Sequence, residues 1–184
     1  LAEQRVHSSI GDGIRLAQAR CIRYRHNNYE QLERLVAENA DQYERIFIVT
    51  ESIFSMDGDE SDLHRLVALK RQYPQVCLYL DEAHAFGVRG QLGLGCAEEQ
   101  GVVGDIDFLV GTFGKADASM GAFVICSETM KQYLVNTMRP LIFTTALPPV
   151  HLEWTLFIVN KLCNMQTRRQ HLAPLRRRVL EALT

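Results

Sequence analysis

The chain has 184 residues, of which 47% are hydrophobic and 23% are charged, and its formal net charge at pH 7 is −2. This length and composition predict one globular domain or part of a larger one. The near-zero net charge excludes a global field that would attract nucleic acid or an anionic membrane. No apolar run approaches the ~20 residues of a membrane helix, and the N-terminal residues lack the layout of a signal peptide.

The cysteines are odd in number and scattered, and they form no CxxC pair (Cys21, Cys77, Cys96, Cys126 and Cys163). This pattern disfavours a disulfide framework and a zinc site, and it fits a reducing cytosol. We therefore expect a soluble cytoplasmic protein without a structural metal.

Strand and helix patterns alternate along the chain, although no evident strand opens it. Residues 28–40 place Leu32, Leu35 and Val36 at helical spacing, and a β-rich run follows at 45–50. A second helix is predicted in 61–74, capped by Ser61 or Asp62, and further strands at 76–80, 107–111 and 122–126. From about residue 150 the pattern is helical, with a break or bend expected near Pro174.

Apolar strands joined by helices predict an α/β fold with a mostly parallel sheet and helices on both faces. In such folds the functional residues follow the carboxyl ends of the strands. Acidic, basic and hydroxyl side chains stand at three of these ends: Glu51 and Ser55, Asp81 and His84, Thr112 and Lys115.

The segment LYLDEAHAFG at 78–87 resembles the acidic strand of a DEAH-type NTPase. Such an enzyme also needs a GxxxxGK[ST] loop ahead of that strand. The nearest candidate, 109–117, has Leu109 in place of the first glycine and Ala116 in place of Ser or Thr, and it follows the acidic strand. The sequence disfavours the NTPase but keeps it as an alternative.

Lys115 offers a different chemistry. Small residues in GTFGKADASMGA leave room beside its amine for a planar ligand, as for a lysine that forms a Schiff base with pyridoxal 5'-phosphate (PLP). Asp81 could pair with the pyridine nitrogen, and Thr112 could hold the phosphate. The residues at the strand ends therefore favour a PLP site.

Six blocks occur in the order found in the α-oxoamine synthases, at 7–10, 25–28, 49–59, 80–95, 110–116 and 141–149. The chain resembles this family of PLP-dependent, fold type I enzymes along nearly its whole length. Family members condense an amino acid with an acyl-CoA thioester. The resemblance is strongest to the biotin-pathway branch, which implies L-alanine and a pimeloyl thioester as substrates.

The resemblance assigns roles around the cofactor ring. His7 would stack on the pyridine, and Asp81 would pair with its nitrogen. His84 and Ser55 would approach the phenolic oxygen. Lys115 would form the internal aldimine and later move the α-proton.

The resemblance also implies a homodimer with shared active sites. Thr112 would hold the cofactor phosphate, and Thr144 would reach the phosphate bound by the neighbouring subunit. Glu51 and Asn27 fall in motifs near the substrate. Residues 1–149 would form the central part of the PLP-binding large domain, and 150–184 a helical segment leading towards a C-terminal small domain that the chain lacks.

The stretch after the lysine departs from the family pattern. Ala118, Met120 and Ala122 stand at or near usual glycine or small positions, and Asp117 replaces an apolar residue. A charge at Asp117 would either alter the pKa of Lys115 or point to solvent.

Two further motifs have simpler interpretations. MDGD at 56–59 is first a turn signal, because the other positions of a calcium-binding loop are absent. The arginines at 168–169 and 176–178 favour a solvated helix face over a nucleic-acid patch, since aromatic residues for base stacking are lacking nearby. A noncatalytic dimerisation or RNA-contact module remains a third alternative.

Overall fold

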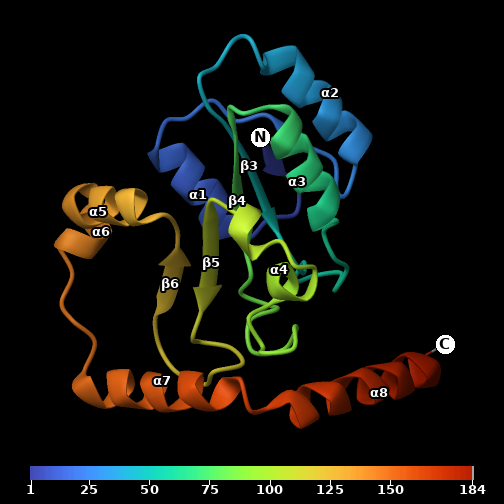
Figure 1. Cartoon of the computed structure of the whole chain (residues 1–184), viewed down its shortest axis with the longest axis vertical. Helices are drawn as coiled ribbons and strands as arrows, with labels where there is room; N and C mark the ends of the chain where they lie inside the picture. The colour runs from blue at the N-terminus through green and yellow to red at the C-terminus, as the bar shows by residue number, and fades with distance from the viewer. Residues whose placement is uncertain (184) are drawn as a thin grey trace.

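The computed structural model describes residues 1–183 as one six-stranded sheet with flanking helices (Figure 1). The strand order is β2-β1-β3-β4-β5-β6, and only the β5–β6 pair is antiparallel among the described strands. The predicted α/β class with a mostly parallel sheet is confirmed.

The longer strands match the β-rich runs of the sequence. They are β3 (Ile46–Glu51), β4 (Val76–Asp81), β5 (Phe108–Thr112) and β6 (Ala122–Ile125). The expectation that no strand opens the chain is wrong, because β1 (Ala2–Glu3) pairs with β2 (Arg23–Tyr24) and with β3. Two residues are too few to show a strand period, so pairing alone defines these strands.

Polar caps start the helices that the sequence predicts. Asn28 accepts a hydrogen bond from Gln31 N at the start of α2 (Tyr29–Asn39), and Asp62 accepts one from Arg65 N at the start of α3 (Leu63–Gln72). The other α-helices are α1 (Ser8–Leu16), α4 (Cys96–Glu99), α5 (Glu128–Thr137), α6 (Arg139–Ile142), α7 (Pro149–Leu162) and α8 (Gln166–Leu183). None of the helices within residues 1–183 has the length and apolarity needed to cross a membrane.

The C-terminal helical pattern breaks elsewhere than expected. The interruption lies at 163–165, between α7 and α8, and Pro174 lies inside α8. Arg169 Nη1 donates a hydrogen bond to Leu162 O at 2.7 Å, so the Arg169 guanidinium binds the backbone carbonyl of the last residue of α7. A cation on a helix C-terminal carbonyl stabilises that terminus, and this contact is invisible in a periodicity pattern.

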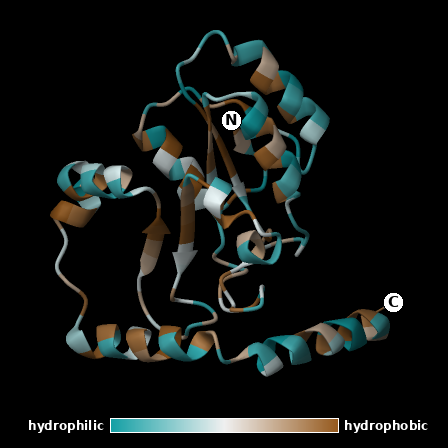
Figure 2. Cartoon of the chain, in the orientation of Figure 1, coloured by the Kyte–Doolittle hydropathy of each residue, from teal (hydrophilic) through white to brown (hydrophobic). Residues whose placement is uncertain are grey.

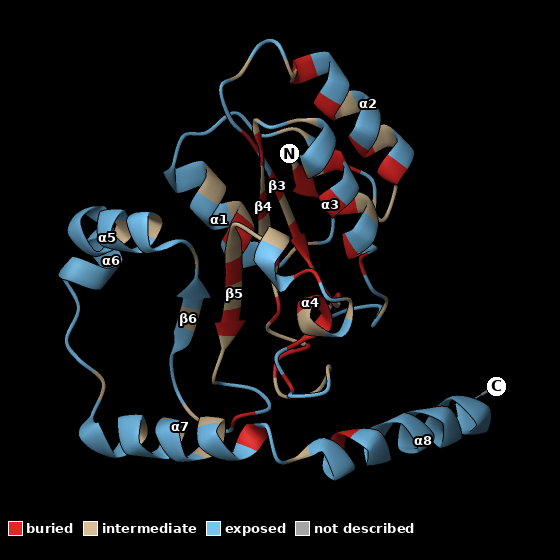
Figure 3. Ribbon diagram, in the orientation of Figure 1, coloured by how far each residue is buried: buried red, intermediate tan, exposed pale blue. Residues whose placement is uncertain are grey.

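The core lies on one face of the sheet. Ile48 and Leu78 meet Leu32 and Val36 of α2 and Leu66 of α3. Each such buried side chain contributes about 1.5–3 kcal/mol to folding. Buried residues concentrate in these strands and on the inner sides of α2 and α3, where the hydrophobic colours also gather (Figures 2 and 3).

The other face of the sheet is covered incompletely, by α1. Phe47 is exposed, and Tyr79 and Val110 are half-buried. A cavity of about 650 Å³ separates these side chains from Ile10 and Ile14 of α1. Helices therefore lie on both faces, as predicted, but only one face forms a packed core.

Candidate active site

The predicted site residues gather near the point where the strand order of the sheet reverses, between β1 and β3. From β1 the chain crosses through α1 to β2, and it then returns through α2 to β3 on the other side of β1. These crossovers leave α1 and α2 on opposite faces of the sheet, so the loops after β1 and β3 diverge there. Such a switch point is the usual ligand site of an open parallel sheet.

Glu51 and Asp81 end adjacent strands in register with each other. His7 N donates a hydrogen bond to Glu51 Oε1 at 2.5 Å, which brings the loop after β1 to the same place. Burial raises the pKa of Glu51, the hydrogen bond from His7 opposes this shift, and the negative charge of Asp81 adds to it. Two carboxyl groups therefore end adjacent strands at the site, and the pKa of Glu51 is raised by its burial.

His84 and Lys115 come together across the site. The distance from Lys115 Nζ to His84 Nε2 is 2.8 Å. Burial lowers the pKa of His84, and the positive charge of Lys115 lowers it further. A neutral imidazole is thus favoured, and its unprotonated nitrogen can accept a hydrogen bond from the amine.

The loop after β5 holds Lys115 without a helix. Thr112 Oγ1 accepts a hydrogen bond from Gly114 N at 3.1 Å and donates one to Gly121 O at 3.2 Å. The chain then turns back into antiparallel β6. A nucleotide-binding lysine loop leads into a helix N-terminus, so the NTPase alternative has no structural support here.

α7 packs on this loop just beyond Lys115. Trp154 Nε1 donates to Ala118 O at 3.0 Å, and the hydroxyls of Thr155 and Ser119 lie 2.6 Å apart. Ala118 has a φ of 47°, a backbone conformation that an alanine adopts only when neighbouring contacts impose it. The lysine loop therefore depends on a helix more than 30 residues away in the sequence.

Glu82 is a structural residue that the sequence interpretation missed. Its buried carboxylate accepts hydrogen bonds from Ser52 Oγ at 2.6 Å and from Cys96 N and Ala97 N at 3.1 and 2.7 Å. A Cβ at Gly95 would lie 2.6 Å from Glu82 Oε2, so only glycine fits beside it. Glu82 thus connects the ends of β3 and β4 to the start of α4. In the sequence, the only indication of this role is an acidic residue directly after Asp81 at the end of a predicted strand.

Three predicted residues lie outside this cluster. Ser55 is exposed in the loop between β3 and α3. Asn27 donates to Asp59 Oδ2 at 3.0 Å and to Glu60 O at 3.3 Å, so it braces that loop. Thr144 is exposed between α6 and α7, in a segment at the edge of the molecule beyond β6 (Figure 1).

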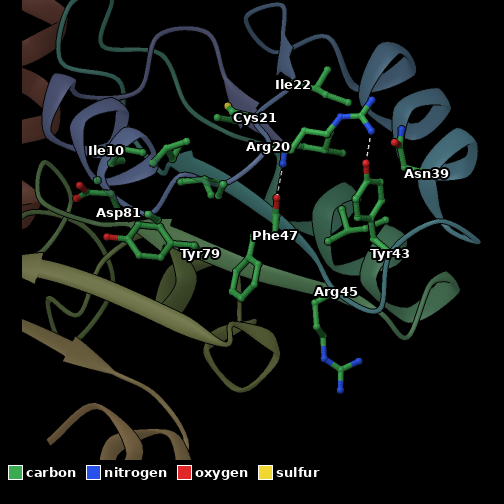
Figure 4. Close-up of a pocket in the computed structure, with 18 of the residues that line it drawn as sticks. Ile10, Arg20, Cys21, Ile22, Asn39, Tyr43, Arg45, Phe47, Tyr79 and Asp81 are labelled. Atoms are coloured by element: carbon green, nitrogen blue, oxygen red, sulfur yellow. Dashed lines mark hydrogen bonds between the residues drawn. The ribbon is translucent and has the colours of Figure 1, made fainter. Parts of the chain in front are cut away.

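The cavity under α1 meets the site at one end only. Asp81 is the single member of the cluster in its lining, and in Figure 4 it lies at the opposite end from Arg45. Lys115 and His84 are not among its lining residues. The cavity is therefore a neighbouring apolar space and not the cradle formed by the cluster.

The donor set of the cluster fits the functional groups of PLP. An amine, a carboxylate and a neutral imidazole lie together, and they match the aldehyde, the pyridine nitrogen and the phenolic oxygen. A hydroxyl and backbone N–H groups, as at Thr112 and Gly114, are the kind of donors that hold phosphate, and in this structure they bond to Gly121 O and to Thr112 Oγ1 respectively.

Comparison with known proteins gives a consistent result. The family model for aminotransferases of class I and II matches residues 1–184. A provisionally named 8-amino-7-oxononanoate synthase from Pasteurella multocida is 56% identical over 183 residues, and one from Haemophilus influenzae is 57% identical over 175 residues. These matches cover 100% and 95% of this chain but 47% and 46% of the relatives, so the chain spans less than half of their length.

Solved structures agree in fold. A serine palmitoyltransferase variant from S. paucimobilis with a bound PLP–myriocin aldimine superposes with a TM-score of 0.87 at 31% identity, covering 94% of this chain and 44% of that one. The 8-amino-7-oxononanoate synthase of Francisella tularensis gives a TM-score of 0.76 at 34% identity, with 93% and 48% coverage.

Proposed function

Because this chain belongs to the class I and II aminotransferase family and resembles the α-oxoamine synthases within it, we propose that it forms part of a PLP-dependent C-acyltransferase. The observation that carries the proposal is the 2.8 Å contact between Lys115 Nζ and His84 Nε2, which joins the loop after β5 to the loop after β4, the adjacent strand that ends in Asp81. A lysine amine beside a neutral imidazole and a carboxylate is the arrangement that PLP chemistry uses.

The residues have separate duties in this proposal. Bound PLP supplies an electron sink for the α-carbon of an amino acid. Asp81 would stabilise a positive charge on the ring nitrogen. His84 would orient the Lys115 amine, and an uncharged imidazole is favoured because burial and Lys115 lower its pKa. Lys115 would hold the cofactor and move the α-proton, His7 would cover the ring, and Thr112 would hold the phosphate.

The proposed reaction is the decarboxylative condensation of L-alanine with pimeloyl-CoA, or a pimeloyl carrier protein, to 8-amino-7-oxononanoate in biotin biosynthesis. The names of the relatives at 56–57% identity support this choice. The structural match to serine palmitoyltransferase supports the alternative of another α-oxoamine synthase, of that type or of the 2-amino-3-ketobutyrate CoA ligase or 5-aminolevulinate synthase type.

The proposed active unit is a cytoplasmic homodimer of the complete polypeptide. Thr144 is exposed on an edge segment, as expected for a residue that reaches the phosphate of a neighbouring subunit. Residues 1–149 would form the central part of the large domain, and 150–184 would lead towards a small domain. The free thiols of all five cysteines fit a reducing compartment.

The first experiment measures the visible absorption of the purified protein after incubation with PLP. The wild type should show a band of lysine-bound PLP that borohydride reduction removes. Lys115→Ala should lack this band, because the variant has lost the amine that contacts His84. Lys131→Ala, which removes an exposed lysine of α5, is the matched control and should retain it.

A folded Lys115→Ala protein that keeps the band would overturn the assignment. If the band is present, addition of alanine, glycine or serine in turn identifies the amino acid. A spectral response to serine or glycine but not to alanine would select one of the alternative family members.

A further inference from the structure

The loop between β3 and α3 is held by cations from outside it. This loop, residues 52–62, carries Ser55 and, besides the α3 cap Asp62, the three acidic side chains Asp57, Asp59 and Glu60. Arg5 pairs with Asp57, His26 with Asp59, and Arg89 with Glu60. Each cation comes from a different segment, so the loop is fixed at three points.

His26 occupies the most enclosed of these points. Its Nδ1 lies 2.9 Å from Glu3 Oε1, and its Nε2 lies 2.6 Å from Asp59 Oδ2. The Glu3 side chain is only 1% exposed, and the ring of Phe54 packs edge-on against the imidazole at 4.6 Å. His26 therefore connects β1 to the loop inside a largely closed space.

The geometry requires a proton on both ring nitrogens. A neutral imidazole has one N–H and one lone pair, and the lone pair would face a carboxylate oxygen. Burial lowers the pKa of His26, but its hydrogen bonds with Asp59 and Glu3 outweigh burial, so the pKa lies above its usual value. The charged form is thus favoured in the folded protein.

Other charged groups around the imidazole do not replace it. Asp57 approaches from the loop, where its carboxylate, His26 and Asp59 offer atoms within 4.8 Å of one another, and Arg5 balances Asp57. Asn27 donates to Asp59 Oδ2 at 3.0 Å but carries no charge. Loss of the His26 proton would leave Glu3 and Asp59 without their shared counter-charge.

We propose that His26 is a positioning residue that, as an imidazolium, clamps the 52–62 loop, and with it Ser55, to β1. The evidence for the clamp is the pair of contacts that His26 makes with Glu3 and Asp59. The consequence for Ser55 rests on the proposed function. As pH rises through the titration of His26, one end of the clamp is lost and the loop loosens.

The test uses the complete polypeptide that contains this chain, with hydrogen exchange of residues 53–60 expressed as protection factors. His26→Gln should lower their protection roughly tenfold or more, the size of a hydrogen bond to a charged group, and should weaken PLP binding several-fold. His64→Gln, which changes an exposed histidine of α3, is the control and should match the wild type.

A second measurement needs no variant. In the wild type, NMR titration of His26 should give a pKa above that of a free histidine, and protection of 53–60 should fall over the same pH range. Protection that stays constant through this titration, or that is unchanged in His26→Gln, would overturn the clamp.

A looser loop with unchanged PLP affinity would overturn the positioning of Ser55 while leaving the proposed cofactor function intact. Absence of PLP binding in the wild type would count against the proposed function, and protection would then decide the clamp alone.

Discussion

Asp117 is a buried carboxyl group two residues from Lys115. Its side chain is 1% exposed, and neither oxygen has a hydrogen-bond partner among the described residues. It does not point to solvent, the simpler of the two outcomes expected from the sequence. Burial raises the pKa of Asp117 above its usual value, so folding makes its ionised form less favourable.

Asp117→Asn should make the protein relatively more stable as pH rises. The raised pKa means that the contribution of Asp117 is fully present below the pKa of the unfolded chain and is lost as pH rises through the folded value. Urea unfolding from pH 4 to 8 should show a growing advantage of the variant, reaching about 1–3 kcal/mol, the cost of a buried unsatisfied group. Asp41→Asn, at an exposed position, is the control. Parallel pH profiles for wild type and Asp117→Asn would contradict a buried titrating carboxyl.

At the scale of elements, the start of α3 shows how one side chain fixes a boundary. The sequence left Ser61 or Asp62 as the cap. Asp62 Oδ1 accepts from Arg65 N at 3.0 Å, whereas Ser61 Oγ donates to Glu51 O at 2.7 Å inside the protein. The two neighbours therefore have different tasks, one for the helix and one for the end of β3.

Asp62→Ala should lower the free energy of unfolding by about 1 kcal/mol, because the first turn of α3 loses its side-chain acceptor. Asp62→Ser keeps an acceptor at the same position and should restore most of the loss. Urea denaturation of the three proteins measures both effects. Equal destabilisation by the alanine and serine variants would show that Asp62 acts through its charge and not as a cap.

The whole molecule has an uneven surface. Residues of β6, α5, α6, α7 and α8 are mostly exposed (Figure 3). Large apolar side chains are exposed in this part of the chain, including Phe143 just after α6 at 73% and Val150 of α7 at 69%. Exposed apolar surface of this extent marks an interaction site in soluble proteins. The proposed homodimer offers one partner for this surface.

Phe143→Glu in the complete polypeptide should weaken self-association by roughly tenfold or more, because a charge would be placed in an apolar contact beside Thr144. Sedimentation velocity over a range of concentrations measures the shift. Leu16→Glu, at an exposed apolar residue of α1, is the matched control and should leave the association unchanged. A dimer as strong in Phe143→Glu as in the wild type would place the interface elsewhere.

Local residue patterns were enough to predict the regular parts of this protein. The runs at β3, β4, β5 and β6 and the apolar positions of α2 and α3 follow from strand and helix periods. The six ordered motifs indicated the α-oxoamine synthases, in agreement with the aminotransferase class I and II match over residues 1–184 and with the relatives and structures similar to this chain. The cluster of Glu51, Asp81 and Lys115 was also foreseeable, because parallel strands end at one edge of a sheet.

Other features depend on contacts between residues far apart in the sequence and became visible only in the folded chain. β1 and β2 exist through pairing, the helix break at 163–165 coincides with the contact from Arg169, and His26 gains its role from Glu3 and Asp59. Burial of Asp117 likewise follows from packing around the lysine loop. Such contacts join residues that no local pattern connects, so charge, burial and proton affinity at these positions emerge only when the chain is folded.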